Sequence, residues 1–105
     1  MPPAPAKLVT VITDFATRDT VERQLAALGI RAFTVSQVRG HGRHGVIRGG
    51  LLQSENVQFT VVTDEPHAAK LMEWAERELV ANFPGIVWMT DAQVVRGSRP
   101  KPKRG

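Results

Sequence analysis

The chain has 105 residues, no cysteine and a formal net charge of +4, which is enough for one domain with a modest core. The absence of cysteine excludes disulfides and thiolate metal sites, and no apolar run approaches the roughly 20 residues that a membrane helix needs. The surplus charge is local, because residues 96–105 hold five basic residues and no acid while the rest is nearly balanced. The sequence therefore predicts a cytoplasmic globular domain whose basic character belongs to its tail.

The first part of the chain predicts a strand, a helix and a second strand. Residues 1–6 contain three prolines and are expected to be disordered, whereas the β-branched run 8–13 is typical of a buried strand. Thr17 or Asp19 can cap the helix that follows, whose apolar residues recur at helical spacing. Apolar and β-branched residues within 31–38 favour a second strand.

The later part repeats this order of elements. Residues 56–63 alternate apolar and polar side chains, as a half-buried strand does. Asp64 is placed to cap a second helix, which the dipeptide Pro-Gly at 84–85 ends. A fourth strand is expected over 86–89, and 94–95 can add a short fifth.

This order predicts an α+β, ferredoxin-like βαββαβ fold, in which an antiparallel sheet of four strands carries two helices on one face. The domain is expected to span residues 7–97, followed by a disordered basic tail over 98–105. The helices leave the other face of the sheet open, and we assign the strand aromatics Phe33, Phe59 and Trp88 to it. A small domain with such a face is expected to oligomerise, and a trimer is predicted.

The most informative segment is a glycine-rich loop over residues 40–55. Its glycines are interleaved with arginines, and no acidic residue occurs between residues 23 and 54. Glycines allow backbone N–H groups to turn toward a ligand, and arginines supply planar donors that suit phosphate or carboxylate oxygens. The loop therefore predicts an anion site with Arg39, Arg43 and Arg48 as ligands, and a solubilising hairpin tip is the alternative.

Other site types find little support in the sequence. Residues 40–45 match the dinucleotide pattern G-x-G-x-x-G, but the residues after them cannot open the helix that this site requires. His41 and His44 lack the further ligands that a metal site needs. No nucleophile and base form a recognisable pair, so we predict no catalytic residue and no enzyme activity. A nucleic-acid-binding module that uses the basic tail is the alternative function.

The segment 33–43 (FTVSQVRGHGR) resembles the second strand and the base of the long T-loop in the PII signalling superfamily. Residues 59–62 and 91–97 are similar to later family segments, and the likeness covers about residues 7–97. Two features depart from the family: a Gly-Asp-Gly-Lys phosphate loop before the last strand is missing, and the T-loop is short and lacks a tyrosine for uridylylation. The ending Val-Val-Arg-Gly looks like the PII-like proteins linked to bicarbonate uptake and carboxysomes.

The resemblance implies a trimer that binds adenine nucleotides in clefts between its subunits. It also implies that an ordered T-loop controls a partner, here a membrane bicarbonate transporter. The missing phosphate loop implies that ADP, AMP or cyclic AMP binds better than ATP, and bicarbonate is a further anion for the arginine-rich region. The nucleotide-binding residues implied by the resemblance are Ser36, Gln37, Val38, Gly40, Gly42, Arg43, Thr60, Val62, Gly85, Ile86, Val87 and Arg96.

Overall fold

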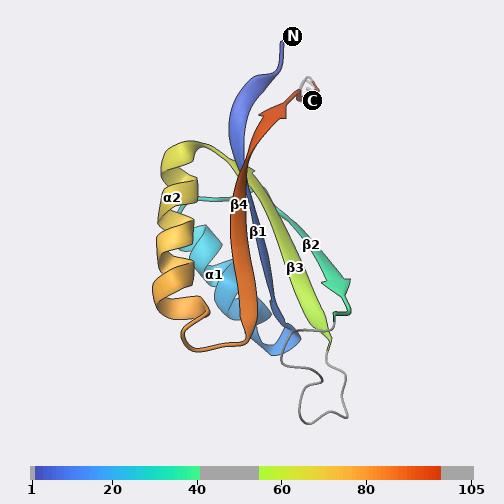
Figure 1. The fold of residues 1–105 in the computed structure, drawn as a ribbon, viewed down its shortest axis with the longest axis vertical. Helices are drawn as coiled ribbons and strands as arrows, with labels where there is room; N and C mark the ends of the chain where they lie inside the picture. Colours follow the sequence, from blue (N-terminus) through green and yellow to red (C-terminus); the bar gives the residue numbers. More distant parts are fainter. Residues whose placement is uncertain (1, 41–54, 98–105) are drawn as a thin grey trace, which may run out of the picture.

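A computed structural model describes residues 2–40 and 55–97 of the protein. Within these residues, four strands and two helices form two layers (Figure 1). The strands are β1 (Ala4–Asp14), β2 (Thr34–Val38), β3 (Asn56–Thr63) and β4 (Gly85–Val94). The helices are α1 (Arg18–Ala27) and α2 (Glu65–Trp74), and α2 continues as a π-helical turn over Ala75–Leu79. Across the described ranges, no helix has the length and apolar character to cross a membrane.

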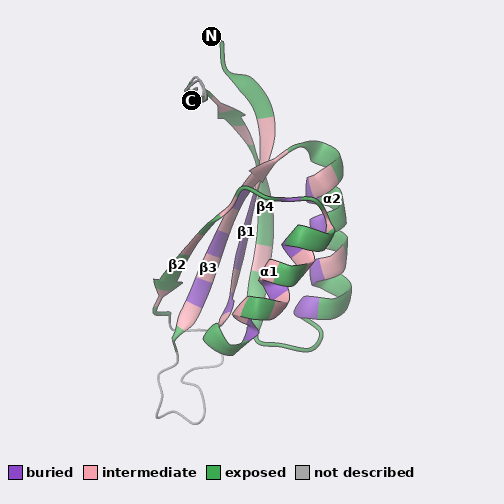
Figure 2. Ribbon diagram, turned by 180° about the vertical axis from the view of Figure 1, so that it is seen from behind, coloured by how far each residue is buried: buried purple, intermediate pink, exposed green. Residues whose placement is uncertain are grey.

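The four strands make one antiparallel sheet in the order β2-β3-β1-β4. β1 and β3 are therefore central, while β2 and β4 are the edges. The register places Val11 of β1 between Phe59 of β3 and Val87 of β4. Both helices cover the same face of the sheet (Figures 1 and 2). This arrangement confirms the predicted ferredoxin-like fold class.

The core lies between this face and the helices. Alternate residues of a strand point to the same face, so every second residue in the middle of β1 and of β3 enters the core (Figure 2). The fully buried strand residues include Val9, Val11, Val57, Phe59 and Val61, and the helices add Val21, Leu25, Ala68 and Leu71. Because these side chains come from segments distant in sequence, their packing fixes the register of the whole sheet.

The prediction that Phe33, Phe59 and Trp88 share the open face is wrong for the two phenylalanines. Phe59 alternates in step with Val57 and Val61, which places it among the core residues with no exposed surface. The ring of Phe33 lies 5.8 Å from that of Phe59 and packs against the same core. Trp88 lies opposite Thr10 on the other face and is 41% exposed.

Two strands are longer than predicted. β1 begins at Ala4, because residues 4–6 pair with residues 92–94 of β4. The prediction that residues 1–6 are disordered is therefore wrong for these three. β3 does not extend this far, so Pro5 has a strand neighbour on one side only, where a strand tolerates proline. The same pairing makes one strand, β4, from the predicted segment 86–89 through Val94, and Val95 lies beyond its end.

Thr17, one of the two predicted caps, occupies the N-cap position of α1, but its side chain makes no cap hydrogen bond. Asp14, at the end of β1, accepts a hydrogen bond from the backbone N–H of Thr17 at 3.1 Å and begins a 3₁₀ turn over Phe15–Thr17. α1 continues from that turn, and the side chain of Thr17 makes no cap of its own. The carboxylate at the strand end therefore does the capping.

The start of α2 confirms the predicted cap. The carboxylate of Asp64 accepts a hydrogen bond from the backbone N–H of His67 at 2.9 Å. This bond, together with one from the His67 ring, lowers the pKa of Asp64 because both favour the charged carboxylate.

Candidate functional site

The predicted nucleotide-binding residues lie at two opposite ends of the sheet. Gly40 follows β2 at one end, where a Cβ in its place would lie 3.8 Å from Nδ2 of Asn56. Arg96 follows β4 at the other end, beyond the pair of Val94 with Ala4. A strand rises about 3.3 Å per residue, so β1 holds these ends about 33 Å apart. One small molecule cannot contact both ends of the same chain.

The end near Gly40 is held together by main-chain pairing. Val38, the last residue of β2, lies opposite Asn56, the first residue of β3. The backbone N–H of Phe15, just after β1, donates to the carbonyl oxygen of Glu55 at 3.0 Å. These bonds hold the two ends of the loop, at Val38 and Glu55, against the sheet.

Of the predicted anion ligands, Arg39 lies in the described part of the chain and is exposed directly after β2. Most of the loop 40–55 and the predicted tail 98–105 lie outside the described residues. Five candidate site residues also lie outside the described residues. They are Gly42, Arg43 and Arg48 of the anion and nucleotide predictions, and the histidine pair His41 and His44.

Five predicted residues share the open face of the sheet. Thr60 lies between Thr34 of β2 and Thr10 of β1, and the same row continues to Trp88 of β4. The other four are Ser36 opposite Gln58, Val38 opposite Asn56, Val62 opposite Leu8, and Ile86 opposite Ile12. The half of this face over β2 and β3 therefore presents mainly hydroxyl and amide groups, and the half over β1 and β4 is mainly apolar.

Two other predicted residues lie on the opposite, helix-covered face. Gln37 lies opposite Val57, and Val87 lies opposite Val11. Because Ser36 and Gln37 are neighbours in one strand, they point to opposite faces. A single chain therefore does not bring the whole predicted set into one site.

The connection from α2 to β4 is held tightly against the end of β1. The hydroxyl of Thr13 donates to the carbonyl oxygen of Pro84 at 2.8 Å. At Gly85, a Cβ would lie only 2.6 Å from the carbonyl oxygen of Ile12, so this position has room for glycine alone. The connection consequently forms no projecting loop that could wrap a phosphate. Sequence analysis missed Thr13, whose sequence signal is its place at the end of a β-branched run.

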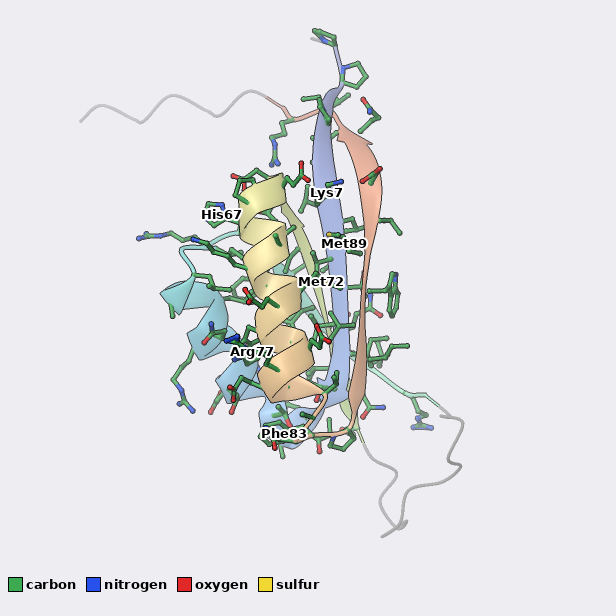
Figure 3. All side chains as sticks on the ribbon, turned by 60° about the vertical axis from the view of Figure 1, so that its left-hand side comes forward. Lys7, His67, Met72, Arg77, Phe83 and Met89 are labelled. Carbon is green, nitrogen blue, oxygen red and sulfur yellow. The ribbon has the colours of Figure 1, made fainter. Side chains whose placement is uncertain are left out.

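An ion pair lies toward the Arg96 end of the sheet. Lys7 of β1 forms an ion pair with Asp91 of β4, and Figure 3 shows Lys7 beside β4. The hydrogen bond to Asp91 raises the pKa of Lys7, against an opposing effect of desolvation. Lys7 therefore stays charged throughout the physiological range, and Arg96 is exposed beyond it.

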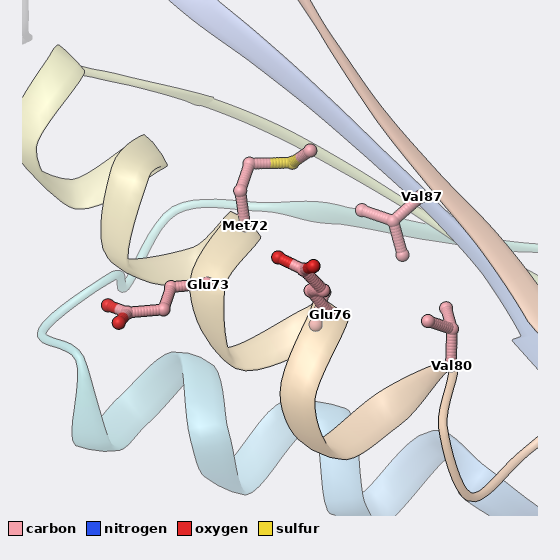
Figure 4. Close-up of a pocket in the computed structure, with 6 residues that line it drawn as sticks. Met72, Glu73, Glu76, Val80 and Val87 are labelled. Carbon is pink, nitrogen blue, oxygen red and sulfur yellow. The ribbon is translucent and has the colours of Figure 1, made fainter.

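A hollow of about 350 Å³ lies between the end of α2 and β4 (Figure 4). Its lining consists of Met72, Glu73, Ala75, Glu76, Val80 and Val87. The hydrogen bond from the N–H of Val80 to the carbonyl oxygen of Ala75 closes the wider π-helical turn at this point. Among the predicted nucleotide-binding residues that the structure describes, Val87 alone lines the hollow. Sequence periodicity did not indicate it, because a π-helical turn has no distinct pattern.

No metal site is evident over residues 2–40 and 55–97, where no three His, Cys, Asp or Glu side chains gather to hold an ion. His67 is engaged with Asp64, its Nδ1 lying 2.7 Å from the carboxylate oxygen at the start of α2. This pair belongs to the helix cap.

The chain matches the family model described as nitrogen regulatory protein P-II over residues 6–99. No curated protein matches the chain.

Solved structures of PII-like proteins share the fold. A PII-like signaling protein from Thermus thermophilus has 22% identity and a TM-score of 0.75, covering 92% of this chain and 96% of its own. CPII from Thiomonas intermedia, bound to ADP and bicarbonate, has 23% identity and a TM-score of 0.76, with coverage of 90% and 92%. The B. subtilis GlnK–ATP complex has 20% identity and a TM-score of 0.63, with coverage of 84% and 82%.

Proposed function

The chain belongs to the P-II family, and from that premise we propose that it is a trimeric regulatory protein that senses adenine nucleotides at its subunit boundaries. Ligand binding would order the T-loop, residues 40–55, and the ordered loop would control a protein partner. The protein would act in the cytoplasm without catalysing a reaction, and its partner would be a membrane transporter for bicarbonate.

The separation of the predicted site residues carries this proposal. Gly40 and Arg39 lie at one end of the sheet and Arg96 at the other, about 33 Å away by the rise of β1. Residues so far apart contact a common nucleotide only when they come from different subunits. The loop end of one subunit and the carboxyl-terminal end of its neighbour would then form one cleft.

The open face of the sheet supports the trimer. Ile86 is 56% exposed and Trp88 is 41% exposed, and both lie on the apolar half of this face. Contiguous apolar surface of this kind marks an interface with another chain. Closed cyclic symmetry would cover this surface in every subunit at once.

The connection before β4 supports a preference for ADP or AMP over ATP. The bond between Thr13 and Pro84, and the close approach of Gly85 to Ile12, hold this connection where the P-II family places its phosphate loop. Without that loop, a terminal phosphate loses donors and binds more weakly. In the same fold, CPII binds ADP, AMP and bicarbonate, and GlnK binds ATP. We include cyclic AMP and bicarbonate among the candidate ligands.

The switch requires that the two states of the T-loop differ in their affinity for the nucleotide. Arg43 and the glycines around it would supply this difference by closing on the phosphates. The other nucleotide contacts would come from Ser36, Gln37, Val38, Gly40, Gly42, Thr60, Val62, Gly85, Ile86, Val87 and Arg96, with Arg39 and Arg48 as further anion ligands.

Native mass spectrometry with AMP, ADP, ATP, cyclic AMP and bicarbonate tests the proposal, because it reports subunit number and ligand together. We expect a trimer that retains ADP or AMP in preference to ATP. A monomer that binds none of these molecules would overturn the proposal.

Calorimetry on Arg43→Ala tests the site itself. The substitution is expected to weaken ADP binding by about 1.5–3 kcal/mol, the value of a hydrogen bond to a charged group. Arg23→Ala, an exposed position on α1, is the matched control and should bind normally. Binding that instead needs residues 98–105 and falls steeply with salt would favour a nucleic-acid-binding module.

A further inference from the structure

β1 and β4 continue past the rest of the sheet as a two-stranded ribbon. The last residue of β3, Thr63, pairs with Lys7, so residues 4–6 of β1 pair only with residues 92–94 of β4. Figure 1 shows both strands extending beyond the end of β3. Arg96 lies two residues past the end of this ribbon and is exposed. The direction in which the ribbon points therefore determines where Arg96 lies.

The ribbon is held weakly by its own side chains. None of residues 2–6 and 92–97 is buried, and three of the six residues that pair within the ribbon are alanines. A two-stranded ribbon without an apolar face to bury is only marginally stable in water. A small change in free energy at its base should therefore change the direction that it holds.

An ion pair stands at the base of the ribbon. Lys7 lies opposite Asp91 in the strand register, and its ammonium group donates a hydrogen bond to the Asp91 carboxylate. After this hydrogen bond, the charges of Asp91 and of Glu65, the first residue of α2, also raise the pKa of Lys7. The side chain of Lys7 is 23% exposed and that of Asp91 is 84% exposed. Lys7 is therefore the anchored partner, and Asp91 can be substituted without disturbing the core.

We infer that Lys7 and Asp91 are a positioning pair for nucleotide binding, which fixes the ribbon at its base and thereby places the guanidinium group of Arg96 against the phosphates. This inference rests on the proposed function, in which Arg96 and the loop end of a neighbouring subunit share one nucleotide. Arg96 is five residues beyond Asp91, a span of at most about 16–18 Å. A rotation of about 10° at the pair would move Arg96 by about 3 Å, which is more than a hydrogen bond tolerates.

The sign of the effect of Asp91→Lys distinguishes this role from a general electrostatic one. The substitution replaces a negative charge by a positive one toward the Arg96 end, and long-range attraction alone would then strengthen the binding of an anionic nucleotide. The new lysine would lie opposite Lys7, however, and like charges in this position repel each other and release the ribbon. We therefore expect the affinity for ADP, measured by calorimetry, to fall about fivefold or more.

Three further variants separate positioning from a loss of structure. The charge-swapped double variant Lys7→Glu, Asp91→Lys restores an attractive pair and should recover most of the affinity. Glu78→Lys makes the same change of charge at an exposed position outside the ribbon and should not weaken ADP binding. Arg96→Ala should lower the affinity, and adding Asp91→Lys to it should cause little further loss, because the pair acts through Arg96.

Hydrogen–deuterium exchange of the full-length protein without nucleotide follows the ribbon directly. The backbone amides within residues 4–6 and 92–94 should exchange about fivefold faster in Asp91→Lys, because their protection reports the free energy of local opening. The amides of the central strand β3 should exchange at the same rate as in the native protein. The charge-swapped variant should restore the slower exchange of the ribbon.

The outcomes distinguish this inference from the proposed function. A native protein that binds no adenine nucleotide would overturn the proposed function and the inference with it. If the native protein binds ADP, an affinity that Asp91→Lys leaves unchanged or raises would overturn the inference alone. Equal exchange of the ribbon amides in the two proteins would also overturn it, as would a loss of affinity that the charge swap does not restore or that adds fully to that of Arg96→Ala.

Discussion

The two faces of the sheet are built from the same strands, but only one of them is covered by helices of the chain. On the helix-covered face, Val9, Val11, Phe59 and their neighbours have no exposed surface. On the open face, the alternating residues of the same strands include Ile86 and Trp88, which remain largely exposed. One face is completed within the chain, while the other carries apolar surface that further copies of the chain would cover.

Along a single strand, residues at alternate positions therefore contribute to different properties. Those on the helix-covered face stabilise the fold, and those on the open face would contact another subunit. Residue 87 belongs to the hollow beside α2, and residues 86 and 88 belong to the open face. A substitution at one position should therefore change folding, and a substitution at the next should change association.

Phe59→Ala gives the largest expected effect, on the helix-covered face. Removing this fully buried ring leaves a cavity among residues of both helices, which costs about 3–5 kcal/mol of the free energy of unfolding. Urea denaturation followed by circular dichroism measures this loss. A loss under about 1 kcal/mol would show that Phe59 does not anchor the core.

Trp88→Glu tests the open face. The substitution should leave the secondary structure intact and weaken subunit association by about 2 kcal/mol or more, because it replaces an aromatic anchor that the proposed trimer would bury with a charge. Native mass spectrometry over a dilution series measures the shift from the proposed trimer to the monomer. An unchanged trimer would separate this face from the subunit contact.

Gly85→Ala tests the point where α2 meets the sheet. The added Cβ would lie 2.6 Å from the carbonyl oxygen of Ile12, and relieving this overlap should cost about 1–3 kcal/mol. Thermal unfolding measures the cost. Gly97→Ala is the matched control, because a Cβ there meets nothing within 4 Å and should leave the melting temperature unchanged.

Asp64→Asn gives the smallest effect, at the start of the helix layer. The hydrogen bond from the N–H of His67, and then that of its ring, lower the pKa of Asp64 in the folded chain. The folded state therefore binds fewer protons, so this contribution is present above the unfolded pKa and is lost as the pH falls through the lowered pKa.

Asparagine keeps the cap acceptor but does not titrate. The melting temperature of the native protein should consequently fall relative to that of Asp64→Asn as the pH drops from neutral to about 3. Parallel melting curves of the two proteins over this range would contradict the assigned role of the carboxylate.

The fold could be predicted because local patterns and global packing agree. The alternation of residues 56–63 gave β3, and the Asp64 cap gave the start of α2. The predictions were wrong where strand pairing between distant segments outweighs the local secondary-structure preference of the residues. Residues 4–6 contain a proline and still form a strand, because residues 92–94 of β4 pair with them. Asp14 caps the 3₁₀ turn that precedes α1, although it is the last residue of β1. A search for a capping residue directly before the apolar pattern of α1 does not find it.

The candidate site was less predictable. Family resemblance names residues such as Gly40 and Arg96 together, but it does not indicate that one chain holds them at opposite ends of the sheet. The hydrogen bond from Thr13 to Pro84 joins residues 71 positions apart, so no local pattern reveals it. The hollow beside β4 depends on a π-helical turn that periodicity does not mark.

The pairing of Ala4 with Val94 brings the beginning and the end of the domain side by side. A short covalent linker between them would therefore impose no strain on the sheet. The polypeptide could be circularised, or reopened at another connection, and still form the same four-stranded arrangement. The point at which the chain begins and ends is thus not what determines the arrangement of the four strands.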